Sequence, residues 1–156
     1  MRVVDANVLL YAVNPSTVNH TASVRWLDAA LDGDDTVGLA WNALLAFVRI
    51  STNPRVMPNP LGAEEAMAQA HDWIAAPSAH VLNPGARHAE ILDRLLSVRG
   101  GTGNLVNDAH LAALALEHHA TIVSYDRDFD LFEGVRADRP DDLLRAADGR
   151  RGDQGR

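Results

Sequence analysis

The chain has 156 residues, of which 47% are hydrophobic and 22% are charged, as expected for a single globular domain. It contains no cysteine, which excludes a disulfide framework, a thiolate nucleophile and a cysteine-ligated zinc site. The formal net charge of −7 argues against a broad basic surface for nucleic acid, and all 14 basic residues are arginine, so chemistry that requires a lysine is excluded.

Apolar residues recur with strand and helix periods along the chain, and glycine- or proline-containing segments separate these stretches. In chain order they predict a strand over 2–5, helices over 7–13 and 20–33, a strand over 36–40, a helix over 41–51, a loop over 52–62, a helix over 63–76, a strand over 80–83, a helix over 86–100, a glycine-rich segment leading into a helix over 100–119, a strand over 120–126, a helical turn over 127–134 and a last strand over 134–140.

Strands separated by helices predict an α/β domain in which helices cover both faces of a central parallel sheet. Asn7 is a candidate N-cap for the first helix. The segment 147–156 is too polar to pack and is expected to be disordered, which leaves one domain over 1–146. No apolar run reaches the roughly 18 residues of a membrane span, and Asp5 interrupts the apolar N-terminus before it resembles a secretion signal. We therefore expect a cytoplasmic protein.

Three aspartates occupy the positions where parallel sheets bind ligands, beyond the carboxyl ends of the strands. Asp5 ends the first predicted strand, Asp126 ends the strand over 120–126, and Asp108 stands near the start of a helix. Each of these three, taken alone, could cap a helix. The same holds for a fourth aspartate, Asp128, for which helix capping is the stronger interpretation. Together they stay ionised only with a cation among them, and oxygen ligands suit Mg²⁺ or Mn²⁺.

Two stretches, VVDANVLLYA and NLVNDAHLAALALEHHATIVSYDRDF, resemble the PIN domain, and specifically the VapC toxins of type II toxin–antitoxin systems. A third stretch, WNALLAFVRISTNPRV, resembles one VapC subgroup more loosely, so that the resemblance spans most of residues 1–138. It implies a three-layer α/β/α domain with a central parallel sheet. It also implies an endoribonuclease that hydrolyses RNA phosphodiesters with water activated by Mg²⁺, for which Mn²⁺ substitutes.

The resemblance places the acidic centre at Asp5, Asp108 and Asp126, with Asp128 as a possible fourth metal ligand. Polar side chains that would hydrogen-bond to these ligands or to bound water are Asn7, Asn42, Asn104 and Ser124. Arginines that flank the predicted site and could bind RNA phosphates are Arg49, Arg55, Arg99 and Arg127, although each alone could equally be a solvated surface charge.

The resemblance further implies a VapB-like antitoxin as partner and a homodimer of this chain. Apolar side chains on two predicted helices offer a candidate surface for an amphipathic antitoxin helix, with packing in the core as the alternative. These side chains are Trp26, Leu27, Trp73 and Ile74.

One position departs from the family pattern, because Asn42 stands where the family usually has a glutamate. An amide oxygen can ligate a metal but contributes no charge, so a catalytically weak or inactive PIN-like binding module is the alternative function. A second rival, an aspartyl-phosphate phosphatase or receiver domain, also places an aspartate after its first strand. The missing lysine and the sequence DAN count against that rival.

Overall fold

A computed structural model describes residues 1–97, 103 and 105–153. Its centre is a sheet of five parallel strands in the order β3-β2-β1-β4-β5. The strands are β1 (Arg2–Val4), β2 (Val37–Ala40), β3 (Ala79–Leu82), β4 (Thr121–Val123) and β5 (Ala137–Asp138). The helices are α1 (Ala6–Val13), α2 (His20–Leu31), α3 (Trp41–Ser51), α4 (Ala63–Ala75), α5 (His88–Ser97), α6 (Leu105–Glu117), the 3₁₀ turn η1 (Asp128–Leu131) and α7 (Pro140–Asp153).

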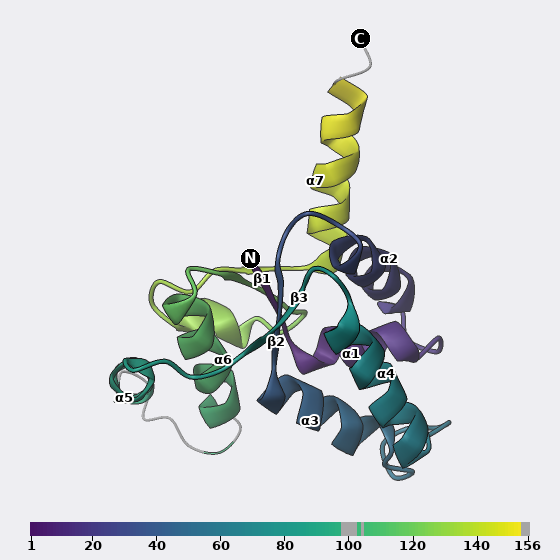
Figure 1. The fold of residues 1–156 in the computed structure, drawn as a ribbon, viewed down its shortest axis with the longest axis horizontal. Coiled ribbons are helices and arrows are strands. Elements are labelled where there is room, and N and C mark those ends of the chain that lie inside the picture. Colours follow the sequence, from purple (N-terminus) through teal and green to yellow (C-terminus); the bar gives the residue numbers. More distant parts are fainter. Residues whose placement is uncertain (98–102, 104, 154–156) are drawn as a thin grey trace.

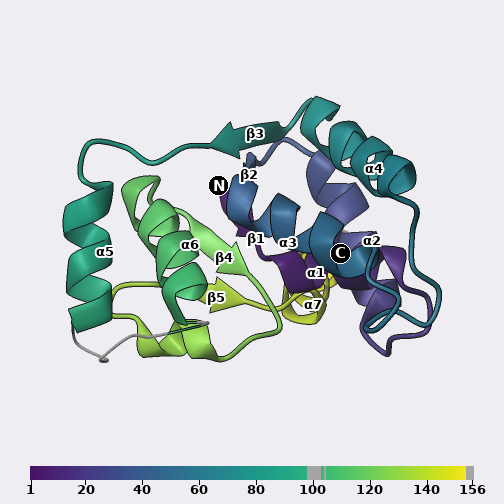
Figure 2. The ribbon, with the colours of Figure 1, turned by 90° about the horizontal axis from the view of Figure 1, so that it is seen from below.

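Helices cover both faces of this sheet, which confirms the predicted α/β/α architecture (Figures 1 and 2). Successive residues of a strand point to opposite faces. Val3 accordingly packs with the core under α5 and α6, whereas Val4 packs with the core under α1, α2, α3 and α4. None of the described helices is long and apolar enough to cross a membrane.

The neighbouring strands β1 and β4 end at the same level of the sheet. Val4 is in register with Val123, so the residues that follow each strand, Asp5 and Ser124, come to lie side by side. Helix α3 also begins at this edge, because it follows β2 directly and the carboxyl ends of parallel strands lie at the same edge of the sheet. This edge is where the candidate site forms.

Helix α7 departs from the expectation of a disordered segment after residue 146, because it runs from Pro140 to Asp153 and stands out from the body of the domain (Figure 1). Its first turns carry Leu143 and Leu144, which pack against the core cluster that includes Trp26. Extending a helix from an anchored first turn costs less than nucleating a new one, which is how a polar segment becomes helical. The division at residue 146 stays a prediction.

The predicted apolar antitoxin surface is wrong for three of its four residues, since Trp26, Leu27 and Trp73 are buried in the core. Helix α7 contacts α2 on the side of Trp26, and the Trp73 ring packs edge-on against Phe47 with 4.8 Å between ring centres. Helical periodicity identified an apolar stripe correctly but did not show which element covers it. The fourth residue, Ile74, is partly buried.

Candidate active site

Asp5 caps helix α1, which corrects the prediction that Asn7 does so. The Asp5 carboxylate accepts a hydrogen bond from the Ala6 backbone N–H at 2.7 Å, and the helix begins at Ala6. Asn7 is therefore the second residue of the helix, and its side chain is free to act at the site. The capping role does not exclude a metal role, because a carboxylate has several acceptor positions.

A set of short hydrogen bonds fixes the second oxygen of Asp5. Ser124, which is buried, donates its hydroxyl to Asp5 Oδ2 at 2.6 Å, and the Asn7 amide donates to the same oxygen at 2.8 Å. The Asn7 amide also donates to Ser124 Oγ at 2.9 Å. The backbone N–H of Asp126 donates to Ser124 Oγ at 2.9 Å, which connects the first and third predicted carboxylates through one hydroxyl. The structure thus brings Asn7 and Ser124 to the predicted place.

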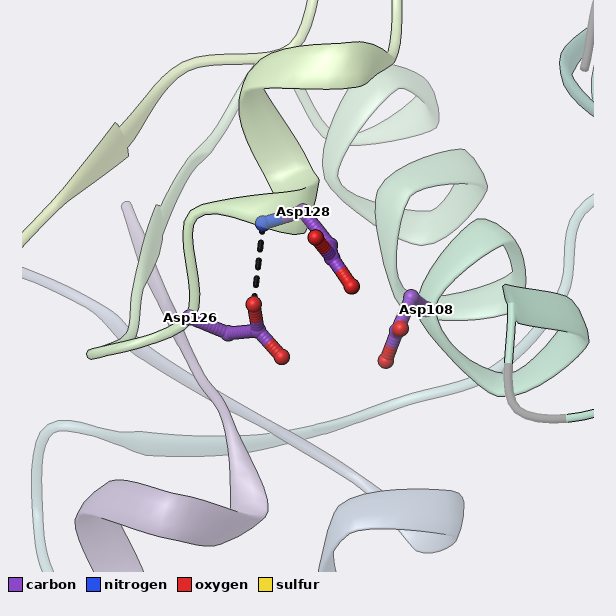
Figure 3. A group of neighbouring side chains, drawn as sticks. All are labelled: Asp108, Asp126 and Asp128. Carbon is purple, nitrogen blue, oxygen red and sulfur yellow. Dashed lines mark hydrogen bonds between the residues drawn. The ribbon is translucent and has the colours of Figure 1, made fainter.

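Asp108, Asp126 and Asp128 converge on a common point (Figure 3). Each offers one carboxylate oxygen, and these oxygens lie within 4.8 Å of one another. The Asp128 backbone N–H donates to Asp126 Oδ1 at 2.9 Å, which turns the chain so that both side chains point toward the start of α6. Asp5 is not in this tight group, although its charge and that of Asp108 influence each other.

The electrostatics of the site favour a bound cation. Burial, followed by the charges of Asp5, Asp126 and Asp128, raises the pKa of Asp108 from 3.8 to about 6. Burial also raises the pKa of Asp5, while the hydrogen bonds from Ser124 and Ala6 oppose that change. Carboxyl groups whose pKa values rise in this way lack a positive partner, and a divalent cation is the usual one.

A hollow of about 190 Å³ adjoins the cluster, and Asp5, Asn42, Asn107 and Asp108 contribute polar atoms to its wall. Asn42 donates its amide N–H to the Asn107 carbonyl at 3.3 Å, but its side-chain oxygen is buried and has no partner among the described residues. A buried oxygen without a donor is costly unless something binds it. The carboxylates and the Asn42 amide offer oxygen atoms, which is the ligand type that Mg²⁺ or Mn²⁺ prefers.

The predicted arginines lie at different distances from this centre. Arg127 directly follows Asp126, and Arg49 lies two turns beyond Asn42 on α3. Arg55 lies in the loop after the far end of α3, and an eleven-residue helix spans about 16 Å, so the structure does not bring Arg55 to the carboxylates. Asn104 and Arg99 lie outside the described residues.

The sequence prediction omitted Arg139, which follows β5 directly at the same edge of the sheet. It lines a second hollow together with Ser124 and Asp126. The rule that identified Asp5 and Asp126, applied to the last predicted strand, would have identified Arg139 as well.

Known proteins match the chain in sequence and in fold. The sequence pattern of the PIN domain matches residues 2–135. Ribonuclease VapC37 of Mycobacterium tuberculosis is 60% identical over 144 residues, which cover 92% of this chain and 100% of that protein. Ribonuclease VapC31 of the same species is 39% identical over 140 residues, which cover 90% of this chain and 99% of that protein.

Solved structures share the fold at low sequence identity. The crystal structure of Mycobacterium tuberculosis VapC20, a toxin that cleaves the sarcin–ricin loop, aligns with a TM-score of 0.64 and 16% identity over 87% of this chain and 99% of that one. VapBC2 from Rickettsia felis, bound to a DNA fragment from its promoter, aligns with a TM-score of 0.65 and 16% identity over 88% of this chain and 97% of that one. The matched residues, together with the sequence relatives, show that the chain belongs to the PIN domain family and, within it, to the VapC ribonucleases.

Proposed function

We propose that this protein is the toxin of a type II toxin–antitoxin module and acts in the cytoplasm as an endoribonuclease that requires Mg²⁺ or Mn²⁺. The observation that carries the proposal is the convergence of carboxylate oxygens of Asp108, Asp126 and Asp128 within 4.8 Å, beside Asp5 and Asn42, whose side-chain oxygen has no partner among the described residues. The strong sequence similarity to VapC37 supports the same activity.

In this proposal Asp5 and Asp108 would hold the principal ion, and the Asn42 oxygen would be a further ligand. A divalent cation, when bound, would neutralise charge on the scissile phosphate and lower the pKa of a nearby water. Asp126, with Asp128 beside it, orients the attacking water and accepts a proton from it. Ser124 and Asn7 keep the Asp5 carboxylate in one orientation through their 2.6 and 2.8 Å hydrogen bonds. As water attacks phosphorus, the bond from phosphorus to the 3′ oxygen breaks, and that oxygen takes a proton from solvent water and leaves as the 3′-hydroxyl.

We expect cleavage of RNA to require Mg²⁺ or Mn²⁺ and to leave a 5′-phosphate and a 3′-hydroxyl. An activated water yields these ends, whereas attack by the ribose 2′-hydroxyl yields a cyclic phosphate. The measurement is treatment of the purified protein with excess EDTA, restoration with each metal in turn, and mapping of the fragment ends by ligation. Full activity in EDTA, or cyclic 2′,3′-phosphate ends, would contradict the metal-dependent mechanism.

The proposed partner is a VapB-like antitoxin that binds a homodimer of this chain. Exposed apolar side chains gather on α3 and α4 rather than on the predicted stripe: Trp41, Leu45 and Met67 are 47%, 60% and 50% exposed. They border a hollow of about 170 Å³. Because Trp41 precedes Asn42, an apolar helix on this surface would end beside the acidic centre, where an antitoxin arginine could reach the carboxylates.

Co-expression with the adjacent open reading frame tests this partner. We expect the two proteins to co-purify, cell growth to recover, and Leu45→Glu to weaken the complex at least about tenfold, because a buried unpaired charge costs well over 1 kcal/mol. Val18→Glu is the matched control, since Val18 is 97% exposed and lies in the loop between α1 and α2. Light scattering of the complex gives its stoichiometry. Persistent growth arrest without co-purification would refute the antitoxin and leave the nuclease activity standing.

A further inference from the structure

A second hollow, of about 180 Å³, lies at the carboxyl edge of the sheet, past the ends of β4 and β5. Its wall includes Ser124 and Asp126, so it adjoins the acidic centre, and it shares no lining residue with the hollow at Asn42. Two arginines, Arg127 and Arg139, also line it. A hollow of about 180 Å³ is large enough to admit a phosphate group.

Two of the four carboxylates that line this hollow are paired with arginines outside it. Asp138 pairs with Arg2 at 2.7 Å, and Asp142 pairs with Arg145 at 2.6 Å. That leaves Asp130, which is exposed, and Asp126, which belongs to the proposed metal centre.

The two arginines of the hollow have no such partners. Within residues 1–97, 103 and 105–153, neither Arg127 nor Arg139 makes an ion pair or a side-chain hydrogen bond. Arg139 is partly buried, and its carbonyl accepts the backbone N–H groups of Asp142 and Leu143 at 3.1 Å, which fixes its backbone at the junction of β5 and α7. A guanidinium in a partly buried position without a carboxylate is available for an anion.

We propose that Arg139 and Arg127 form a subsite for a backbone phosphate of the RNA strand, next to the phosphate that is cleaved. This inference rests on the proposed function, because it assumes that RNA crosses the acidic centre. It explains how a chain of net charge −7 positions an anionic substrate: two guanidinium groups that have no ion pair within the described part of the chain lie beside the carboxylates, and a broad basic face is not needed. A phosphate contact fixes the position of the strand without reading its sequence.

The test compares Arg139→Gln, Arg127→Gln and the double variant with Arg136→Gln. Arg136 is the matched control because it is exposed, lies on the chain just before β5, and lines a hollow at the opposite edge of the sheet. All are placed in an Asp108→Asn background, which keeps the RNA intact. Binding of a fluorescein-labelled single-stranded RNA of random sequence is measured by anisotropy over a series of salt concentrations.

We expect Arg139→Gln to weaken binding about tenfold, as for loss of one charge-assisted hydrogen bond, and the exposed Arg127→Gln to weaken it less. The slope of log affinity against log salt should fall by about 0.7 for each arginine that no longer binds a phosphate. Equal affinities and slopes for the Arg139 and Arg136 variants would overturn the subsite. Failure of the wild-type protein to cleave RNA with Mg²⁺ or Mn²⁺ would instead overturn the proposed function, and the binding assay reads the subsite independently of cleavage.

Discussion

Asp108→Asn should raise the melting temperature of the metal-free protein by about 2–4 °C while it lowers RNA cleavage at least about a thousandfold. The loss of cleavage follows from the removal of a proposed metal ligand, since bound metal contributes several kcal/mol at the transition state and each 1.36 kcal/mol is a factor of ten. The gain in stability follows from the removal of a partly buried charge that faces three other carboxylates.

The size of the stability gain comes from the raised pKa of Asp108. A change from 3.8 to about 6 corresponds to about 3 kcal/mol of unfavourable ionisation, which solvent screening at this partly exposed position reduces to about 1–2 kcal/mol. The start of α6 favours a negative charge by about 0.3–1 kcal/mol, which offsets part of the gain. About 1 kcal/mol remains, and in a chain of this length it shifts the melting temperature by about 2–4 °C.

The dependence on pH provides a second measure of the same charge. A carboxyl group with a raised pKa binds a proton more readily in the folded protein, so its destabilising effect is complete above pH 6 and disappears as the pH falls toward 3.8. The advantage of Asp108→Asn over wild type should therefore shrink as the pH falls from about 7.5 to 5. The histidines, including His110 with its lowered pKa, are common to both proteins and cancel in this difference.

Glu64→Gln is the matched control for Asp108→Asn. Glu64 lies in the first turn of α4 and is exposed, so its replacement removes a negative charge from a helix start without a cluster of carboxylates around it. This control should keep full cleavage and gain no stability. A melting temperature of Asp108→Asn equal to or below that of wild type, at pH 7.5 without metal, would show that the carboxylates do not repel one another as described.

The sequence was sufficient to place these aspartates at one edge of the sheet because the relevant rule depends on topology, whereas their role as a metal centre stays a prediction. Asp5 and Asp126 come just after strands whose carboxyl ends lie at the same edge of any parallel sheet. Asp108 lies near the start of α6, the helix that precedes β4, and the start of such a helix lies at that same edge. The N-cap was misassigned because both Asp5 and Asn7 are good capping residues, and only the position where the strand ends decides between them.

Surface features could not be predicted in the same way, since they depend on contacts between distant parts of the chain. Trp26 is buried in a core cluster against which Leu143 and Leu144 of α7 pack, more than 100 residues later in the chain. The ion pairs around Arg139 likewise depend on long-range contacts. Asp138, the neighbour of Arg139 in the chain, pairs with Arg2, which lies 136 residues away in the sequence. Sequence periodicity indicates that a helix has an apolar face, but it does not indicate which other element of the fold packs against that face.

Asn42→Glu should tighten Mg²⁺ binding by about 5- to 150-fold, which corresponds to the roughly 1–3 kcal/mol typical of one added charge at a partly buried site. Asn42 lines the same hollow as Asp5 and Asp108, and its buried side-chain oxygen lacks a donor among the described residues. A glutamate there would add a further carboxylate. It should therefore lower the melting temperature of the metal-free protein and enlarge the stabilisation by Mg²⁺.

Asn42→Gln separates the effect of charge from that of side-chain length. It has the length of the glutamate and keeps the amide, so it should not bind Mg²⁺ more tightly than wild type does. Calorimetric titration measures the affinities, and equal values for the glutamate and glutamine variants would place Asn42 outside the metal site. Cleavage rates at saturating Mg²⁺ then decide between the two functions. If the wild-type protein cleaves as fast as Asn42→Glu there, the asparagine lowers only metal affinity and the domain is an active nuclease. If only the glutamate variant cleaves, the natural asparagine makes the domain a binding module.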